Sequence, residues 1–248
     1  MTFRKNNTYK YEAGKTFKLS RSGIDSFIKC QRCFYLNKVG NIKDIGMPAF
    51  SLNSAHDELM KKELDICREK AEAHPYMESI KRNLIPFQHE NMGDWRNNFK
   101  GITYHHEKTD LILTGSVDDV WIDIDTEELV IVEYKSTSTQ GEIDLNYGTP
   151  WKEQYKRQID IYQWLFKMNG FKVANDSVFL YSNGLKTSKR FNDVMKFKTY
   201  VLEYKGSTEW VEPKILEIKK VLDQNSVPRL NENCDTCSYV ESVQTYNT

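Results

Sequence analysis

The spacing of apolar and polar residues along the chain predicts both helices and strands. Apolar positions that recur every three or four residues indicate amphipathic helices, whereas alternating or short unbroken apolar runs indicate strands. The helical pattern covers residues 22–36, 51–73, 150–169 and 207–225. The strand pattern covers residues 111–122, 128–137, 177–184 and 195–205. The sequence therefore predicts an α/β fold.

Capping and turn residues set the expected ends of these elements. The N-caps that the sequence offers are Ser20 or Ser22 for the first helix and Ser207 or Thr208 for the last. Pro75 should stop the second helix. Pro150 can begin the third helix, and Gly170 can end it. The dipeptide Asn183-Gly184 is expected to form a tight turn after its strand.

The remaining segments show no strong periodicity of apolar residues, so their predicted structure is less regular. Residues 1–19 are polar and are expected to be extended or loosely ordered. A short helix is expected around Tyr76–Asn83. Residues 84–110 are expected to be irregular, with Trp95 and Phe99 anchoring them in the core.

The order of the predicted elements indicates how they assemble. Two strands, a helix and two further strands follow one another, with helices before and after them. A helix between neighbouring strands acts as a right-handed crossover to a parallel strand, which is the role expected of residues 150–169. The sequence thus predicts a mixed central β-sheet flanked by helices. Because no repeat or low-complexity linker interrupts the chain, one domain over residues 1–248 is expected.

The stretch Leu111–Thr137 contains charged residues inside two otherwise apolar runs. Side chains alternate between the two faces of a strand, so Glu133 and Lys135 share a face. The acidic turn at 123–127 is short enough for a hairpin, which would bring Asp118 alongside Glu133. Two carboxylates and one ammonium group are therefore expected on one face of a two-stranded ribbon.

Such a ribbon is suited to a hard divalent cation. Mg²⁺ prefers oxygen ligands, which Asp118, Glu133 and the backbone carbonyl of Tyr134 could supply. A metal held there could lower the pKa of a water molecule, and Lys135 could orient that water or stabilise a transition state. The alternative is a salt-bridged pair, Glu133 and Lys135, on an edge strand.

The sequences GSVDDV and VEYKST, separated by the hairpin turn, resemble the active-site signature of the PD-(D/E)XK nuclease superfamily. Val117 stands where the motif has its proline. The resemblance implies a restriction-endonuclease-like core and a nuclease that depends on Mg²⁺ or Mn²⁺. It also implies that Asp118, Glu133 and Lys135 are catalytic.

Two further motifs resemble the RecB-like branch of that superfamily, which includes CRISPR-adaptation exonucleases. Gln158 and Tyr162 match its Q-x-x-x-Y motif, and His56 matches its metal-binding histidine, although Leu52 replaces the glycine four residues earlier. The resemblance implies exonuclease-like cleavage of single-stranded DNA or duplex ends, in repair, recombination or defence. Without the resemblance, Tyr162 is a core aromatic, Gln158 an ordinary helix residue and His56 a surface histidine.

Two CxxC motifs lie about two hundred residues apart, Cys30–Cys33 and Cys234–Cys237. Four thiolates suit tetrahedral Zn²⁺ or an iron–sulfur cluster, provided that the chain ends meet. RecB-like nucleases with a 4Fe–4S cluster join their ends in this way, but with one N-terminal and three C-terminal cysteines. The alternative is four small core residues, the role also expected of Cys67.

Basic and aromatic residues gather at two places. The basic residues are Lys152, Lys156 and Arg157 after the hairpin loop, and Lys186, Lys189 and Arg190 after the Asn-Gly turn. Tyr147, Trp151 and Tyr155 could stack on unpaired bases. A charge run is more often a solvated face.

Composition narrows the classes of function. Lys plus Arg and Asp plus Glu both number 35, so nucleic acid would have to bind through a local patch. No run is long enough to cross a bilayer, and no apolar secretory signal opens the chain, so a cytoplasmic protein without a membrane partner is expected. The alternatives to a nuclease are a non-catalytic nucleic-acid-binding module of this fold and a metal-stabilised interaction protein.

Overall fold

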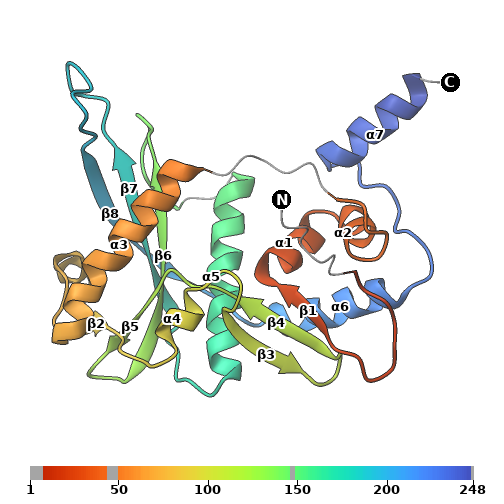
Figure 1. The fold of residues 1–248 in the computed structure, drawn as a ribbon, viewed down its shortest axis with the longest axis horizontal. Coiled ribbons are helices and arrows are strands. Elements are labelled where there is room, and N and C mark those ends of the chain that lie inside the picture. Colours follow the sequence, from red (N-terminus) through yellow and green to blue (C-terminus); the bar gives the residue numbers. More distant parts are fainter. Residues whose placement is uncertain (1–7, 44–49, 146–148, 247–248) are drawn as a thin grey trace. The chain divides into compact units, whose positions relative to one another are not determined.

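The computed structural model describes residues 8–43, 50–145 and 149–246. The chain divides into two compact units (Figure 1). The terminal unit joins both ends of the chain to one internal segment and consists of Met1–Met47, Thr103–Thr114 and Glu209–Thr248. The sheet unit consists of Pro48–Ile102 and Gly115–Thr208. The expectation of one domain over residues 1–248 stays a prediction.

The terminal unit combines four helices of the described chain with a three-stranded sheet. The strand order is β1-β4-β3, and β1 is parallel to β4. The strands are β1 (Phe17–Ser20), β3 (Ile102–His106) and β4 (Leu111–Gly115), and the helices are α1 (Arg21–Lys29), α2 (Gln31–Lys38), α6 (Val211–Asp223) and α7 (Asp235–Tyr246). Phe27 of α1 and Phe34 of α2 meet edge to face, with ring centroids 5.2 Å apart, so these two helices share an apolar core.

The single helix expected over residues 22–36 is wrong, because the chain breaks it at Cys30. Cys30 has an extended backbone (φ −161°, ψ 110°), so α1 ends before it and α2 begins after it. The Sγ of Cys30 accepts the N–H of Cys33 at 3.4 Å and thereby caps α2. The N-cap predicted at Ser20 is confirmed, since its hydroxyl accepts the N–H of Gly23.

Other elements of this unit also differ from the sequence-based expectation. Phe17–Ser20 forms a strand at the end of the segment that was expected to be extended or loosely ordered. The strand was not predicted, because four residues are too few for a period to be recognised. Helix α7 was not predicted. The last long helix begins at Val211 rather than after a cap at Ser207 or Thr208, because Ser207 still belongs to the sheet unit, where its N–H is donated to Asp160.

The sheet unit is built on a five-stranded sheet with the order β2-β5-β6-β7-β8. Its strands are β2 (Leu84–Pro86), β5 (Asp119–Asp123), β6 (Glu128–Thr137), β7 (Asp176–Gly184) and β8 (Phe197–Lys205), and its helices are α3 (Ser51–Lys70), the 3₁₀ helix η1 (Pro75–Ser79), α4 (Met92–Trp95) and α5 (Pro150–Met168). As predicted, β6 and β7 are parallel and are connected through α5, while the other neighbouring strands are antiparallel. The α/β class with a mixed sheet flanked by helices is confirmed.

Alternation along β6 divides its side chains between the two faces of this sheet. Val132 and Tyr134 pack with Met60 and Leu64 of α3 in one apolar core. The residues between them therefore face the opposite side, where α5 lies. Among the described helices of both units, none combines the length and apolar composition that spanning a bilayer requires.

Segments that looked uniform or irregular in the sequence are differently organised in the structure. The apolar run over residues 111–122 is split between β4 and β5, which belong to different sheets. Residues 84–110 are not irregular, because β2, α4 and β3 lie there. Trp95 is buried, as predicted, but Phe99 is exposed, so its role as a core anchor is wrong.

Several predicted ends of elements shift as well. The helix expected around Tyr76–Asn83 is only the short 3₁₀ helix η1. Helix α3 ends at Lys70, because Ala71 adopts a left-handed backbone with φ +52°. Asn183-Gly184 forms no turn, since both residues pair with β8. Pro150 does begin α5, and Gly170, with φ +86°, follows its end as predicted.

Candidate active site

Strand β6 presents Glu133 and Lys135 on the face of the sheet that α5 covers. Their side chains are only 3% and 14% exposed, and the Nζ of Lys135 donates to Oε1 of Glu133 at 2.5 Å. Burial alone would lower the pKa of Lys135, but the charges of Glu133 and Asp118 outweigh it and raise that pKa above its usual range. Lys135 is therefore an ammonium cation at neutral pH and no proton acceptor.

Asp118 lies beside this pair, immediately before β5. The register of β5 and β6 pairs Asp119 with Val132, so the next position along places Asp118 opposite Glu133, as the hairpin predicted. The backbone N–H of Tyr134 donates to Oδ2 of Asp118 at 2.9 Å, and the Nζ of Lys61 on α3 lies 3.6 Å from Oδ1. The Asp118 carboxylate is thus oriented from β6 on one side and from α3 on the other.

Helix α5 completes the surroundings of the lysine. Lys135 Nζ donates to Oε1 of Gln158 at 3.4 Å, and Nε2 of Gln158 donates to the hydroxyl of Tyr162 at 3.0 Å. Lys135 Nζ also lies 4.4 Å from the ring centroid of Tyr155. Gly115 allows Tyr162 its place, because a Cβ there would lie 2.5 Å from the tyrosine ring. The two residues of the Q-x-x-x-Y motif therefore connect α5 to the lysine.

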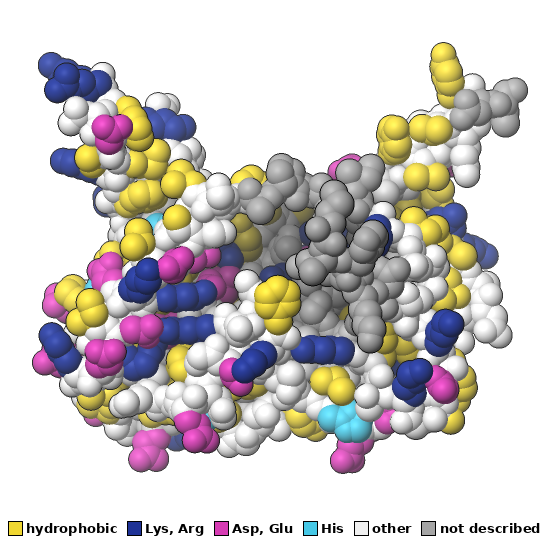
Figure 2. Space-filling view, in the orientation of Figure 1, with side chains coloured by type: hydrophobic (Ala, Val, Ile, Leu, Met, Phe, Trp, Pro, Cys, Tyr) yellow, Lys and Arg dark blue, Asp and Glu magenta, His cyan; other side chains and the backbone are white. Residues whose placement is uncertain are grey.

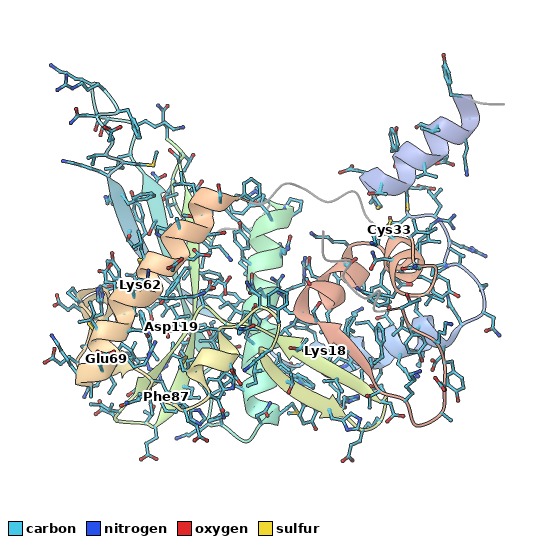
Figure 3. All side chains as sticks on the ribbon, viewed as in Figure 1. Lys18, Cys33, Lys62, Glu69, Phe87 and Asp119 are labelled. Carbon is cyan, nitrogen blue, oxygen red and sulfur yellow. The ribbon has the colours of Figure 1, made fainter. Side chains whose placement is uncertain are left out.

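Behind the site, Asp119, which is labelled in Figure 3, anchors a buried ionic network on the α3 face. Arg68 of α3 donates to its Oδ1, as does Arg96 at 2.8 Å, and the hydroxyl of Tyr134 donates to Oδ2 at 2.8 Å. Arg96 also contacts Asp65 of α3. This network fixes α3 to the start of β5, directly next to Asp118.

Sequence reasoning missed Asp119, Lys61 and both arginines. Adjacent strand residues point to opposite faces, so the pair Asp118-Asp119 carried a signal that one carboxylate faces the site and the other a core. No signal linked Arg68 or Arg96 to that position, because they lie in distant segments.

His56 does not form one tight cluster of ligand atoms with the two carboxylates. It is on α3, its ring centroid is 5.5 Å from that of Phe197 on β8, and its Nδ1 is 3.5 Å from Asp57. The ligand atoms of His56, Asp118 and Glu133 do not all lie within 4.8 Å of one another. The metal-ligand role of His56 stays a prediction.

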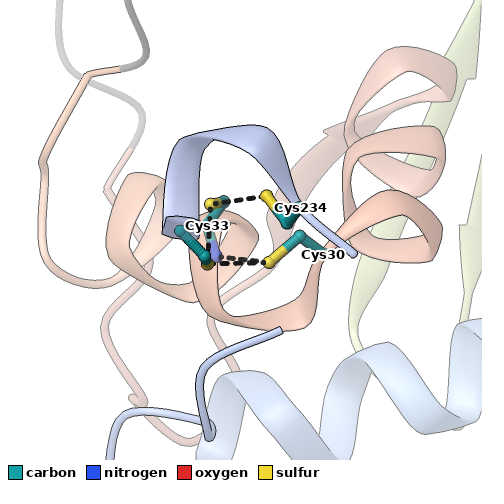
Figure 4. A group of neighbouring side chains, drawn as sticks. Cys30, Cys33 and Cys234 are labelled. Carbon is teal, nitrogen blue, oxygen red and sulfur yellow. Dashed lines mark hydrogen bonds between the residues drawn. The ribbon is translucent and has the colours of Figure 1, made fainter. Parts of the chain in front are cut away.

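In the terminal unit, the four cysteines of the two CxxC motifs come together (Figure 4). The Sγ–Sγ distances are 3.6 Å for Cys30–Cys237, 3.7 Å for Cys33–Cys234 and 3.8 Å for Cys33–Cys237. Burial raises the pKa of Cys30 and Cys33, whereas for Cys234 burial is outweighed by the N–H of Cys237 and by the neighbouring thiols, which lower its pKa. These four sulfur atoms could hold a metal ion.

Some of the basic and aromatic residues that could contact nucleic acid are already paired within the sheet unit, and others are exposed. Lys152 pairs with Asp144 and Lys156 with Glu153. Trp151 is exposed and touches Tyr155 edge to face. The basic residues Lys186, Lys189 and Arg190 are exposed beyond the end of β7, and Tyr147 lies outside the described residues.

Two comparisons with known proteins give matches that extend over nearly the whole chain. No curated protein matches the sequence. Among solved structures, the crystal structure of SSO0001 matches over 94% of this chain and 87% of its own, with 17% sequence identity and a TM-score of 0.34. The family model of the PD-(D/E)XK nuclease superfamily matches residues 18–242, which include the hairpin, α5 and the four clustered cysteines. The fold is accordingly of the restriction-endonuclease-like kind, and the chain belongs to the PD-(D/E)XK nuclease superfamily.

Proposed function

We propose that this protein is a metal-dependent deoxyribonuclease that hydrolyses phosphodiester bonds at Asp118, Glu133 and Lys135. The observation that carries the proposal is the position of Lys135, a buried cation that donates to Glu133 and to Gln158 beside the carboxylate of Asp118. The same proposal includes exonuclease-like action, a RecB-like origin and a role in DNA repair, recombination or defence, which the Gln158 and Tyr162 pair supports. It also includes a single domain over the whole chain.

The donor set fits a hard divalent cation, Mg²⁺ or Mn²⁺. Asp118 and Glu133 offer carboxylate oxygens from neighbouring positions of the ribbon, and the carbonyl of Tyr134 is the third proposed ligand. The Tyr134 N–H orients the carboxylate of Asp118, and Lys135 orients that of Glu133. When bound, the cation would supply Lewis-acid stabilisation of phosphate charge and would favour loss of a proton from water.

The residues of the site would then have different roles in the hydrolysis. A water oxygen forms a bond to phosphorus, one P–O ester bond breaks, and the water's proton ends on the leaving oxygen, giving a phosphate end and a hydroxyl end. Lys135, being an ammonium group, would donate to the attacking water or to the phosphate oxygens as negative charge develops. Gln158 and Tyr162 are positioning residues that hold Lys135 in place.

The test is cleavage of end-labelled DNA by the purified full-length protein. We expect cleavage with Mg²⁺ or Mn²⁺ and none when no divalent cation is added, and labels at the 5′ or 3′ end would show the polarity. Glu133→Gln, which keeps the shape of the side chain but loses its charge, should be inactive. Wild-type protein that cleaves no DNA with either cation, or equal cleavage by Glu133→Gln, would contradict the proposal.

For the cysteine cluster we propose one structural Zn²⁺ rather than a 4Fe–4S cluster. In a tetrahedral site with Zn–S bonds of about 2.3 Å, the sulfur atoms lie about 3.8 Å apart. The three Sγ–Sγ distances of 3.6 to 3.8 Å agree with that value. A four-iron cluster needs more widely spaced sulfurs, because its iron and sulfide atoms occupy the space between them. The division into two and two cysteines also favours a single ion.

Metal analysis together with a visible absorption spectrum tests this assignment. We expect colourless protein with about one zinc per chain. Cys33→Ser should lose most of that zinc, whereas Cys67→Ser, which alters the cysteine on α3, should retain it. Brown protein containing iron and sulfide would overturn zinc, and protein free of both metals would overturn the site.

A further inference from the structure

Lys61 reaches the proposed active site from α3. Its Nζ lies 3.6 Å from Oδ1 of Asp118, and the two side chains are 27% and 18% exposed. The next residue, Lys62, instead pairs with Glu58 of the same helix at 2.6 Å. Figure 2 shows Lys and Arg side chains next to Asp and Glu side chains over α3. Lys61 differs from Lys62 because its carboxylate partner lies outside the helix and belongs to the site.

The two oxygens of the Asp118 carboxylate have different partners. Oδ2 accepts the backbone N–H of Tyr134 at 2.9 Å. Oδ1 faces the ammonium group of Lys61, at a distance typical of an ion pair and too long for a hydrogen bond. The proposed Mg²⁺ or Mn²⁺ also requires an oxygen of this carboxylate. Because two cations repel each other, the metal ion and the Lys61 ammonium group would compete for Asp118.

Lys61 and Lys135 differ in how firmly the protein holds them. The side chain of Lys135 is 14% exposed and donates to Glu133 and Gln158. Lys61 is more exposed, and Asp118 is its only partner among the residues that the structure describes. A lysine carries its charge on a flexible four-carbon stem, so its ammonium group can move when its one partner is taken. Lys61 is therefore the movable cation of the two.

A DNA phosphate offers Lys61 a second anionic partner in the same place. Phosphate oxygens are ligands of the same divalent cations that bind carboxylates. A phosphate would therefore come to the carboxylate that Lys61 already contacts, and a lysine ammonium group binds phosphate as a point charge. Because Lys plus Arg and Asp plus Glu both number 35, attraction to DNA depends on local contacts of this kind.

We propose that Lys61 pairs with Asp118 in the absence of metal and moves to a phosphate oxygen of the DNA when Mg²⁺ or Mn²⁺ binds the carboxylate. The inference rests on the proposed nuclease function and deepens it, because it links metal binding to substrate binding. Lys61 is then a substrate-binding residue, whereas Lys135 acts in the reaction. One substitution at Lys61 should accordingly strengthen binding of the metal ion alone and weaken binding of DNA.

The first measurement is binding of Mn²⁺ alone to the full-length protein, followed by the electron paramagnetic resonance signal of free Mn²⁺. Asp118→Asn should lose the site, which identifies it. Lys61→Ala and Lys61→Gln should both bind Mn²⁺ about two- to fivefold more tightly than wild type, the scale of removing one partly exposed ion pair. Lys62→Ala is the matched control on the same helix and should bind Mn²⁺ as wild type does.

The second measurement is the affinity for fluorescein-labelled single-stranded DNA with saturating Mg²⁺, followed by fluorescence anisotropy. It uses Lys135→Ala protein, whose expected slow cleavage leaves the DNA intact. Adding Lys61→Ala should weaken binding and reduce the slope of log Kd against log salt concentration by about 0.7, the value for one phosphate contact on a single strand. Adding Lys62→Ala should change neither quantity. A lysine with a merely structural role would leave the slope as it is.

Two results would overturn the proposal. One is Lys61→Ala protein that binds Mn²⁺ no more tightly than Lys62→Ala protein. The other is a salt dependence of DNA binding that Lys61→Ala leaves unchanged. Failure of the nuclease proposal is a different result, in which wild-type protein cleaves no labelled DNA while Lys61→Ala still has its opposite effects on the binding of Mn²⁺ and of DNA.

Discussion

Lys135→Ala is expected to lower kcat for metal-dependent DNA cleavage by roughly two to three orders of magnitude, the scale of losing one preorganised donor to a transition state. In our proposal this lysine is the fixed cation that the protein itself brings to the reacting phosphate. It is buried and donates to Glu133 and Gln158. The measurement is single-turnover cleavage of labelled DNA under saturating protein.

Two comparisons make this result specific to Lys135. Lys62→Ala removes an exposed lysine of α3, paired with Glu58, and should leave the rate unchanged. Lys135→Arg keeps the charge but not the shape, so it should recover only part of the activity. Because the charges of Glu133 and Asp118 raise the pKa of Lys135 above its usual range, loss of its proton should cause no fall in rate between pH 6 and 9. Full activity of Lys135→Ala would show that this residue is not catalytic.

Asp119→Ala is expected to lower the free energy of unfolding of the sheet unit by about 3–5 kcal/mol, the scale of breaking a buried ion pair by removing one partner. The side chain of Asp119 is fully buried and accepts from Arg68, Arg96 and Tyr134. Without the carboxylate, both guanidinium groups remain in the interior, and the partly exposed Asp65 is the carboxylate that still contacts them. Urea unfolding followed by tryptophan fluorescence measures the change.

A surface carboxylate provides the control for Asp119. Asp94→Ala removes an exposed ion pair with Lys100, which should change stability by less than about 1 kcal/mol. If Asp119→Ala unfolds at the same urea concentration as Asp94→Ala, the arginine network does not stabilise the fold. Because Asp119 adjoins Asp118, folded Asp119→Ala protein should also cleave DNA more slowly.

The site was the most predictable part of this molecule, because strand alternation and hairpin register are strict rules. Glu133 and Lys135 share a face whatever surrounds them, and a short turn leaves few ways to pair Asp118. The spacing of Gln158 and Tyr162 on one helix made their contact predictable in the same way. What each of these residues does in the reaction stays a prediction.

Elements that depend on distant segments were not predictable. The apolar run 111–122 looks continuous, yet its two halves pair with different sheets, and the pairing partners lie elsewhere in the chain. The break at Cys30 has no glycine or proline to signal it; the extended backbone there is compatible with the gathering of four cysteines. The role of Asp119 in a buried ion-pair network was likewise recognisable only from the positions of Arg68 and Arg96 in the fold.

The separation of the two CxxC motifs in the sequence determines when the cysteine cluster can form during translation. Its two halves are separated by 201 residues from Cys33 to Cys234, so a ribosome adding about 5–20 residues per second needs roughly 10–40 s to supply the second half. During that interval α1 and α2 carry two thiols without their partners, and the whole sheet unit is synthesised. The cysteine cluster can therefore form only after the segment that carries Cys234 and Cys237 has been synthesised, long after α1 and α2.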